Sequence, residues 1–513
     1  MQRKQLTLVI VSLLVVVLSV SLAYFTAQII GKGKDVSVTS ANLQIVFTDS
    51  DGALTETDIE PGWSATKTFT IKNDTKTEYK YNIVIKDLLN TFVTEGYLQY
   101  KITSTNNGYN MTEFKDIPKS SIATDTILAY SVVIPNGVTQ SYTIEFKYAN
   151  DESVDQSIDM NKKLSGTLFI TEGTEQPTFY STLLSDRGIS TTNRTTFSAA
   201  FDSTDQVLYT AKEDNKTVYY FAGNVATNWV KFGKNASNQD LYWRIIRTNS
   251  DGGIRLLYHG TSTTATDAYI GISAFNSTYN NSMYVGYMYG TSGSQASNRT
   301  NTNNSTIKTA IDNWYATNLN TNYGKYISTT AVYCNDREVG SGTYSATGSN
   351  FYYAAFTRLE TNKTPTYTCT NTDDKFTVDS SAGNGKLTYP IALMTADEIS
   401  YAGGLYANYN ANAWYFRNAK EGTLTTSSSS TDASYSSTGS NWWWLLSPYF
   451  WSGNYARVFY VGGSSGPGYL DNDFVLDSFG VRPAVSLKSC VKTSGGDGSA
   501  SAPYTIEEST SGC

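Results

Sequence analysis

Alternation of apolar and polar residues in several short segments is the feature that most limits how this 513-residue chain can fold. In Ala65–Asn73, Phe69 and Ile71 fall on one side of an extended strand and three threonines fall on the other. Such a period-two pattern indicates strands with one buried and one solvated face. The pattern recurs, with turn signals between the segments, in Tyr79–Lys86, Ser141–Tyr148 and Leu164–Thr171. We therefore expect residues 35–173 to form an immunoglobulin-like β-sandwich.

A second region follows a stretch without periodicity, residues 174–196, which we interpret as a linker. Residues 197–490 mix strand-like runs with two helical segments. Ser305–Leu319 has apolar residues at helical spacing, and Thr395–Glu398 has the form of a capping box. We expect an α+β domain here, followed by a Gly/Ser-rich tail at 491–513. The chain as a whole is predicted to be mainly β.

The N-terminus indicates export. The apolar run Leu6–Phe25 follows the basic residues Arg3 and Lys4 and contains no charge. About 20 apolar residues suffice for a helix to cross the hydrocarbon core of a bilayer. Positively charged residues before such a helix stay on the cytoplasmic side of the membrane, so the chain after the helix is exported. Residues 1–34 are thus expected to be either an uncleaved membrane helix or a signal peptide cut after Ala23. Both alternatives place the protein outside the cell, as a single-pass surface protein or a secreted one.

The four cysteines, Cys334, Cys369, Cys490 and Cys513, show no CxxC spacing, so no zinc site is expected. Outside a cell we favour a Cys334–Cys369 disulfide worth about 3 kcal/mol, with free buried thiols as the alternative. Pairing of Cys490 with Cys513 is left open. The net charge of −7 argues against nucleic acid as a partner, and neither a metal nor a cofactor is expected.

The segment Trp442–Lys488 carries the strongest functional signal, because two sets of residues are interleaved in it. The first set suits a buried strand framework: Trp444, Leu446, Val458, Val461, Leu470, Val475, Val481, Ala484, Val485 and Leu487. The second set is aromatic or small and polar, like an antibody paratope, and clusters of exposed aromatic residues mark recognition surfaces. The expected ligand-binding residues are Tyr449, Phe450, Asn454, Tyr455, Tyr460, Tyr469, Asp471, Asn472, Asp473, Phe474, Leu476, Asp477 and Phe479.

Several motifs of this region resemble a known family. Trp443-Trp444, Ser447-Pro448, Ala456–Phe459 and Gly480–Leu487 are similar to motifs in the variable proteins of diversity-generating retroelements. The resemblance implies a C-type-lectin-like fold, akin to the formylglycine-generating enzyme, for residues 197–490. It also implies a hypervariable binding surface, because mutagenesis in such families replaces adenines, chiefly in Asn codons. All the expected binding residues are of types reachable from an Asn codon.

Two further resemblances point to a bacterial cell surface. Ile59–Asn73 resembles the Pro-Gly strand signature of the camelysin and biofilm-fibre group of surface proteins, which implies a stalk built from the β-sandwich. Asn228–Gly233, Leu241–Arg247, Tyr333–Arg337 and Lys386–Glu398 resemble a widespread domain of gut-bacterial surface proteins.

Catalysis is not expected. His259 is the one histidine in the sequence, and no GxSxG motif accompanies it, so we interpret it as structural. Asp471, Asp473 and Asp477 offer a calcium site as an alternative, but the sugar-binding tripeptides of lectins are absent. The formylglycine-generating enzyme uses a pair of cysteines in its active site. Cys490 is the one cysteine near Trp442–Lys488, so we do not expect that enzyme's activity here.

The sequence thus predicts a cell-surface receptor or adhesion protein that binds an extracellular protein or glycan. If the N-terminal helix stays uncleaved, it anchors the protein to the membrane. Two alternatives are a structural fibre or matrix subunit and a carboxylate-dependent glycan hydrolase. Replacing Tyr455 or Tyr469 with alanine is expected to weaken ligand binding and leave the fold intact.

Overall fold

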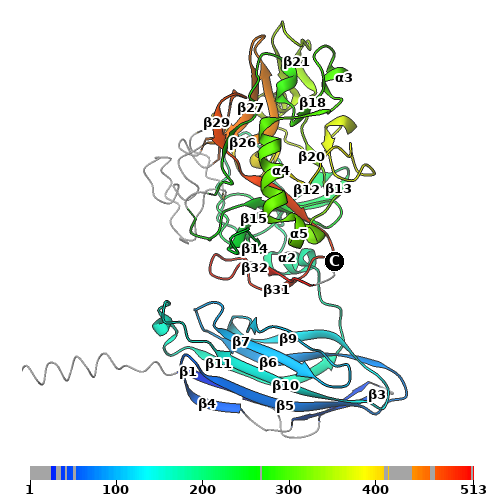
Figure 1. Cartoon of the computed structure of the whole chain (residues 1–513), viewed down its shortest axis with the longest axis vertical. Helices are drawn as coiled ribbons and strands as arrows, with labels where there is room; N and C mark the ends of the chain where they lie inside the picture. The colour runs from blue at the N-terminus through cyan, green and yellow to red at the C-terminus, as the bar shows by residue number, and fades with distance from the viewer. Residues whose placement is uncertain are drawn as a thin grey trace, which may run out of the picture. The chain divides into compact units, whose positions relative to one another are not determined.

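The computed structural model describes residues 25–30, 36–40, 43–49, 54–265, 268–408, 414, 442–462, 468–509 and 512–513. It divides into two compact units, Met1–Gln176 and Pro177–Cys513, and each has its own apolar core (Figure 1). Both units are mainly β, as predicted. No helix in the described ranges is long and apolar enough to cross a membrane. The expected membrane helix lies outside those ranges except for Phe25.

The first unit contains two sheets that share one core. The strand orders are β4-β1-β11-β6-β9 and β2-β3-β5-β10-β7-β8. Across the core, the Tyr81 hydroxyl of one sheet donates to Gln140 of the other at 2.6 Å. The strands are β1 (Phe25–Ile30), β2 (Val36–Ser40), β3 (Leu43–Asp49), β4 (Leu54–Ile59), β5 (Ser64–Asn73), β6 (Tyr79–Asn90), β7 (Leu98–Ser104), β8 (Lys115–Asp116), β9 (Ser120–Ile134), β10 (Thr139–Tyr148) and β11 (Lys163–Glu172).

The first strand corrects the expected start of this domain at residue 35. β1 begins at Phe25 and pairs in parallel with β11 and antiparallel with β4. The stretch Phe25–Ile30 (FTAQII) alternates apolar and polar residues for most of its length, so it suits a sheet, although the sequence analysis assigned residues 1–34 to export.

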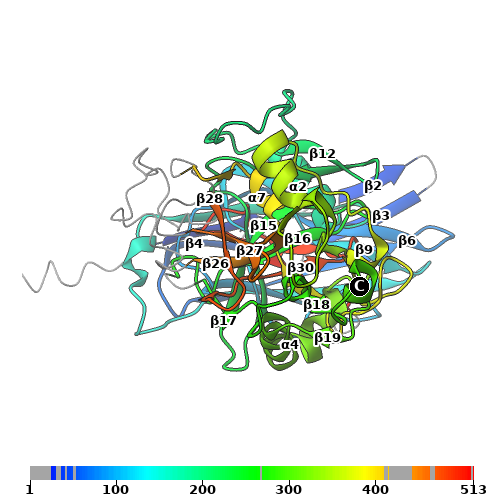
Figure 2. The same cartoon turned by 90° about the horizontal axis from the view of Figure 1, so that it is seen from above.

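The second unit, called the head below, contains two larger sheets around one core. The first has the order β24-β30-β16-β15-β14-β32-β31, with β12 and β13 attached, and Figure 2 shows its paired strands β16 and β30 side by side. Its strands are β12 (Tyr209–Glu213), β13 (Lys216–Tyr220), β14 (Trp229–Lys234), β15 (Asp240–Thr248), β16 (Ile254–Tyr258), β24 (Ile391–Leu393), β30 (Pro483–Leu487), β31 (Thr493–Gly495) and β32 (Tyr504–Ile506).

The second sheet of the head has the order β17-β29-β26-β27-β28-β25, and β22 and then β21 extend it from β26. Two short pairs, β18–β19 and β20–β23, lie outside both sheets. The strands are β17 (Ile272–Ala274), β18 (Met288–Tyr289), β19 (Asn303–Asn304), β20 (Tyr333–Cys334), β21 (Val339–Gly342), β22 (Phe351–Tyr353), β23 (Lys375–Phe376), β25 (Leu405–Tyr406), β26 (Trp443–Trp451), β27 (Ala456–Val461), β28 (Tyr469–Phe474) and β29 (Ser478–Gly480).

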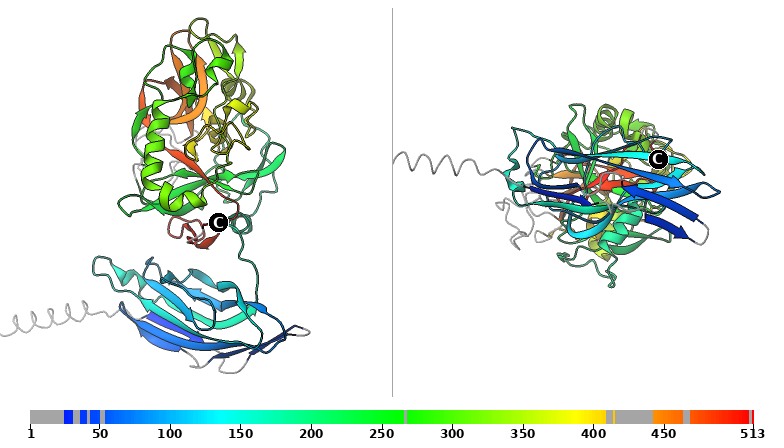
Figure 3. Two further views of the ribbon diagram at one scale, coloured as in Figure 1. Left: turned by 45° about the vertical axis from the view of Figure 1, so that its right-hand side comes forward. Right: turned by 90° about the horizontal axis from the view of Figure 1, so that it is seen from below.

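Both predicted helices of the head are present. Helix α4 (Thr306–Asn318) begins after the N-cap Ser305 and buries Ile307 and Ile311. Figure 3 shows it along one side of the head. Helix α7 (Ala396–Tyr401) has the predicted capping box. The other helices are α2 (Phe179–Arg187), α3 (Gln295–Asn298), α5 (Asn320–Tyr323), α6 (Ala354–Phe356) and the π-helix η4 (Thr357–Asn362).

Two expected boundaries are wrong. The expected linker contains α2, whose Phe179 and Leu183 are buried in the core of the head because they are one helical turn apart. The expected tail is part of the fold, since β32 pairs with β14 and β31, and a disulfide joins Cys490 to Cys513.

Candidate binding site

A row of half-buried side chains crosses four strands of the second sheet. Tyr352 on β22, Phe450 on β26, Arg457 on β27 and Phe474 on β28 are directly opposite one another in register. Residues that pair across strands point to the same face of a sheet. The rings of Tyr352 and Phe450 are 4.3 Å apart, and the Arg457 guanidinium lies 4.1 Å from the ring centre of Phe474. Together with two neighbouring rings, this row forms what we call the aromatic face: Tyr352, Phe356, Tyr449, Phe450, Arg457 and Phe474.

A bulge in β26 brings Tyr449 to this face. Two steps along β26, from Pro448 to Phe450, match one step along β27. Proline cannot donate a backbone hydrogen bond, which favours an interruption of the ladder at this point. Tyr449 is the extra residue, and its ring packs 5.2 Å from that of Phe356 and 5.0 Å from that of Phe459. Tyr449 is 7% exposed and forms the floor of the aromatic face.

One end of the face continues into two exposed tyrosines. The rings of Tyr279 and Tyr455 are stacked at 4.9 Å and are 37% and 38% exposed. Tyr455 also packs against Phe474 at 4.7 Å. Arg457, which also packs against Phe474, donates from Nη1 to Oδ1 of Asn472 at 3.0 Å. The Nε of Arg457 has no hydrogen-bond partner. The result is a continuous row of rings and planar polar groups open to solvent at one end.

The other end of the face is acidic. Glu360 lies on η4, and its Oε2 is buried without a hydrogen-bond partner. Burial raises the pKa of Glu360, and the charge of Lys363 and a hydrogen bond with Tyr449 partly offset that rise. Beside Glu360, the hydroxyls of Tyr406 and Tyr449 are 2.7 Å apart, and Tyr469 donates to Asp471 at 2.7 Å. Asp471 pairs with Tyr460 across β27 and β28, so it points to the other face of the sheet.

The predicted binding residues divide between this surface and other places. Tyr449, Phe450, Tyr455, Asn472 and Phe474 lie on the aromatic face or at its open end, and Tyr469 and Asp471 point to the other face of β28. Tyr460 falls on the opposite face of β27, where it stacks on Trp442 at 4.8 Å and packs against Phe479. Asn454 and Leu476 are exposed.

Three residues expected to be exposed are buried: Tyr449, Tyr460 and Tyr469 are 7%, 4% and 5% accessible. The expectation of a fully exposed aromatic set is wrong at these positions. Tyrosine has a large apolar body and is intermediate in its preference for burial, so its residue type alone does not reveal its exposure. All ten framework residues of the segment, in contrast, are buried.

The aspartates of β28 protect the edge of the sheet. Asp471 Oδ1 accepts from the backbone N–H of Asn472 at 2.8 Å, and Asp473 Oδ1 accepts from that of Phe474 at 2.9 Å. Carboxylates that occupy edge N–H groups discourage pairing with another strand. Asp477 lies near Asp473, and burial together with that neighbour raises the pKa of Asp477. No group of three potential metal ligands occurs in the described part of the chain.

A small cavity lies beside α7, and its lining is strongly charged. Its volume is about 20 Å³. Its charges are paired within the wall: Glu398 accepts from Arg247 at 3.0 Å and from Arg255 at 2.8 Å. The pKa of Glu398 is lowered because the stabilisation by the two arginines outweighs the effect of burial. Arg358 likewise bridges Asp336 and Asp397. These ion pairs assign the region a structural role.

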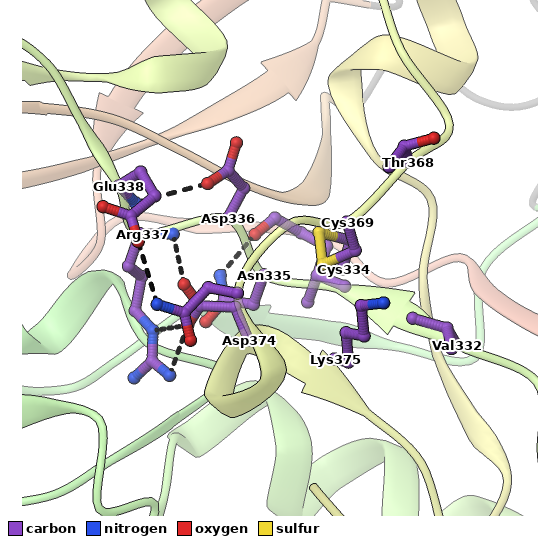
Figure 4. The surroundings of a disulfide bond; sticks show 12 residues. Val332, Cys334, Asn335, Asp336, Arg337, Glu338, Thr368, Cys369, Asp374 and Lys375 are labelled. Atoms are coloured by element: carbon purple, nitrogen blue, oxygen red, sulfur yellow. Dashed lines mark hydrogen bonds and ion pairs between the residues drawn. A yellow bond between two sulfur atoms is a disulfide. The ribbon is translucent and has the colours of Figure 1, made fainter. Parts of the chain in front are cut away.

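Figure 4 shows the residues Cys334–Arg337 of the motif Tyr333–Arg337 around a disulfide bond. A disulfide joins Cys334 to Cys369, with an S–S distance of 2.04 Å. The Arg337 guanidinium is buried against Asp374, and Asn335 donates to the carbonyl of Leu446 at 2.7 Å. The motif thus connects strand β20 to β26.

His259 is fully buried against Trp229, with ring centres 4.4 Å apart. Burial lowers its pKa, and the neighbouring Arg482 and Arg244 lower it further. The imidazole is therefore neutral and enclosed, as the structural interpretation requires.

Sequence reasoning missed Tyr279, Tyr352, Phe356, Glu360 and Tyr406. A signal existed for two of them, because Tyr352 and Phe356 belong to an aromatic run, Phe351–Phe356 (FYYAAF). Nothing in the local sequence distinguishes Glu360 from other surface acids.

A family model described as "Domain of unknown function (DUF6273)" matches residues 271–489 of this chain. This range includes the aromatic face and the disulfide between Cys334 and Cys369. No curated protein matches the sequence. One solved structure, titled "AvmM Catalyzes Macrocyclization in Alchivemycin A Biosynthesis", is similar to 28% of this chain over 98% of its own length, with 9% sequence identity and a TM-score of 0.15. A TM-score this low supports no inference about fold or function.

Proposed function

We propose that this protein is an exported binding protein whose head recognises a ligand through the aromatic face. The observation that carries the proposal is the in-register row from Tyr352 to Phe474, which holds apolar rings half-exposed on a sheet. Monomeric proteins rarely leave contiguous aromatic surface open without a partner. Aromatic residues and arginine are also the types that dominate binding hot spots.

Other features support export and a binding role. Two disulfides suit an oxidising environment outside the cytoplasm. The bulge at Tyr449 re-aims a side chain toward the face, which is a common use of bulges beside functional sites. The charged residues beside α7 are paired with one another, which makes that part of the head a rigid support.

The resemblance to retroelement variable proteins is part of this proposal, and the structure narrows where variation would act. Substitution at the exposed positions Tyr455, Asn454 and Leu476 would alter the surface without disturbing the core. The DNA around the gene provides the test: a nearby reverse-transcriptase gene and a near-copy of the coding sequence that differs at adenines would support diversification. Absence of both would contradict it.

The binding role is tested with the purified full-length protein on a printed glycan array and an immobilised panel of bacterial and mammalian surface proteins. We expect saturable binding to a ligand on one of them, weakened by about 1–3 kcal/mol in each of Phe450→Ala and Tyr455→Ala. Ile272→Ala is the control, because Ile272 is 61% exposed on β17 and does not belong to the face. Absence of binding, or equal effects of all three variants, would contradict the proposal.

A further inference from the structure

One end of the first unit is defined by the pairing of its strands. β1 runs parallel to β11, so Thr26 lies beside Lys163 at the start of both strands. β6 ends beside them and β9 begins there, because Asn90 pairs with Leu164 on one side and with Ser120 on the other. We call this the β1 end (the left-hand end of the unit in Figure 1), and it consists of residues 60–63, 91–97, 118–122 and 149–163.

Exposed apolar side chains collect at the β1 end. Over residues 59–176, the valine and isoleucine side chains that are exposed are Val93, Ile122, Val133, Val154 and Ile158. All except Val133 belong to the β1 end, and Ile122 is 76% exposed. Hydrogen bonds join the segments that carry them. The backbone N–H of Val93 donates to Asp159, and Lys119 Nζ donates to the Val93 carbonyl at 2.7 Å.

This distribution is typical of a surface that contacts something apolar. Single exposed apolar residues are normal, but their concentration in one place marks an interaction surface. Trp63 and Tyr97 lie at the same end and are half-buried. Tryptophan and tyrosine are the residues that proteins place at the boundary between a membrane and water.

The sequence next to the β1 end indicates that the apolar partner is lipid. The apolar run Leu6–Phe25 ends on the first residue of β1, so no spacer separates the two. A spacer would add about 3.5 Å per residue. A run of this length that crosses a bilayer therefore leaves the β1 end at the membrane surface. The route to the head leaves from the opposite end of the unit, where Glu172 of β11 pairs with Tyr81.

The charges of the β1 end identify apolar contact as the force that acts there. Acidic side chains outnumber lysines, so attraction to anionic lipid does not hold this end at a membrane. The acids whose side chains are exposed or half-buried are Glu60, Glu95, Asp151, Glu152 and Asp155, and the lysines are Lys119, Lys162 and Lys163.

We propose that the β1 end lies in the headgroup region of a membrane, with Val93, Ile122 and Ile158 in contact with lipid and the N-terminal segment uncleaved. This inference rests on the export part of the proposed function and selects the uncleaved alternative. It does not depend on recognition by the head.

The test uses the full-length chain in phosphatidylcholine nanodiscs, with a nitrobenzoxadiazole label on one introduced cysteine. Ile122→Cys is compared with Val133→Cys, an exposed position on the same strand, β9, toward its other end. Lipid that carries a nitroxide on its acyl chain should quench the label at position 122 by about twofold or more and leave the label at position 133 unquenched. Equal quenching at the two positions, or none at either, would overturn the proposal.

A double variant separates lipid contact from the effect of the tether alone. Val93→Asp combined with Ile158→Asp should reduce the quenching at position 122 by at least half, because a carboxylate resists transfer out of water. Val133→Asp is the control and should leave it unchanged. If the double variant is quenched as strongly as the parent, the tether alone holds this end near lipid and the contact surface is wrong. Raised salt should have no effect, and a loss of quenching in salt would mean that charge holds the end there.

The mass of the intact protein, recovered from the membranes of bacteria that produce it, tests the tether itself. The full mass is expected. A chain that begins after Ala23 would overturn the proposal, while binding by the head, measured on the arrays, would stand.

Discussion

Arg337 and Asp374 form an ion pair that is sealed from solvent, with the Arg337 Nε 2.6 Å from one carboxylate oxygen and its backbone N–H 3.0 Å from the other. Their side chains are 1% and 0% exposed. Arg299 contacts the same carboxylate at 3.2 Å. Asp374 therefore contacts two arginines inside the head, and Arg299 also pairs with Glu338 at 3.1 Å.

We predict that Asp374→Asn lowers the free energy of unfolding by about 3–5 kcal/mol, because it leaves buried guanidinium charge without a counter-ion. Urea denaturation of the full chain measures the change. The neighbouring Asp373→Asn makes the same chemical change at an exposed side chain and should cost less than about 0.5 kcal/mol. Similar losses in both variants would show that the buried pair is not the cause.

The framework of the head could be predicted from the sequence because it depends on local patterns. Apolar runs identified ten of the buried residues of Trp442–Lys488, and the capping box of α7 is encoded within four residues. The aromatic face could not be predicted, because it depends on strand register between β22 and β26, whose residues are about a hundred positions apart. The bulge that turns Tyr449 to this face also leaves no periodic signal.

His259 makes the stability of the head depend on pH below its ordinary pKa of 6.5. Its pKa is held well below the ordinary value of 6.5 in the folded protein. Below pH 6.5 the unfolded chain binds a proton that the folded chain does not, so the free energy of unfolding falls as pH falls. The slope is at most about 1.4 kcal/mol per pH unit.

Urea denaturation between pH 5 and 7 checks this, with His259→Gln as the comparison. Whatever its overall stability, His259→Gln should lack the part of the pH dependence of the free energy of unfolding that comes from the imidazole. The wild-type imidazole should also show no titration by NMR near pH 6.5, and a native imidazole that titrates there would contradict the assignment.

Replacement by alanine should lower the stability of the head much more at Tyr469 than at Tyr455. Tyr469 is 5% exposed, and its ring lies so close to Gly462 that an added Cβ there would be 2.6 Å away. Its loss should cost about 2–4 kcal/mol of stability. Tyr455 is 38% exposed, so its loss should cost under about 1 kcal/mol. Thermal unfolding compares the two, and equal destabilisation would contradict the burial seen here.

The disulfide between Cys334 and Cys369 should stabilise the head because it closes a loop of 35 residues. Replacing both cysteines with serine should cost about 2–4 kcal/mol, since the unfolded chain regains the entropy of that loop. The pair Cys490 and Cys513 closes a shorter loop of 23 residues and serves as the comparison. Loop entropy alone makes the two costs differ by about 0.4 kcal/mol. A much larger loss at Cys334 and Cys369 would mean that the disulfide also holds β20, and with it Arg337 and Asn335, in place. Unchanged stability in dithiothreitol would show that neither bond contributes.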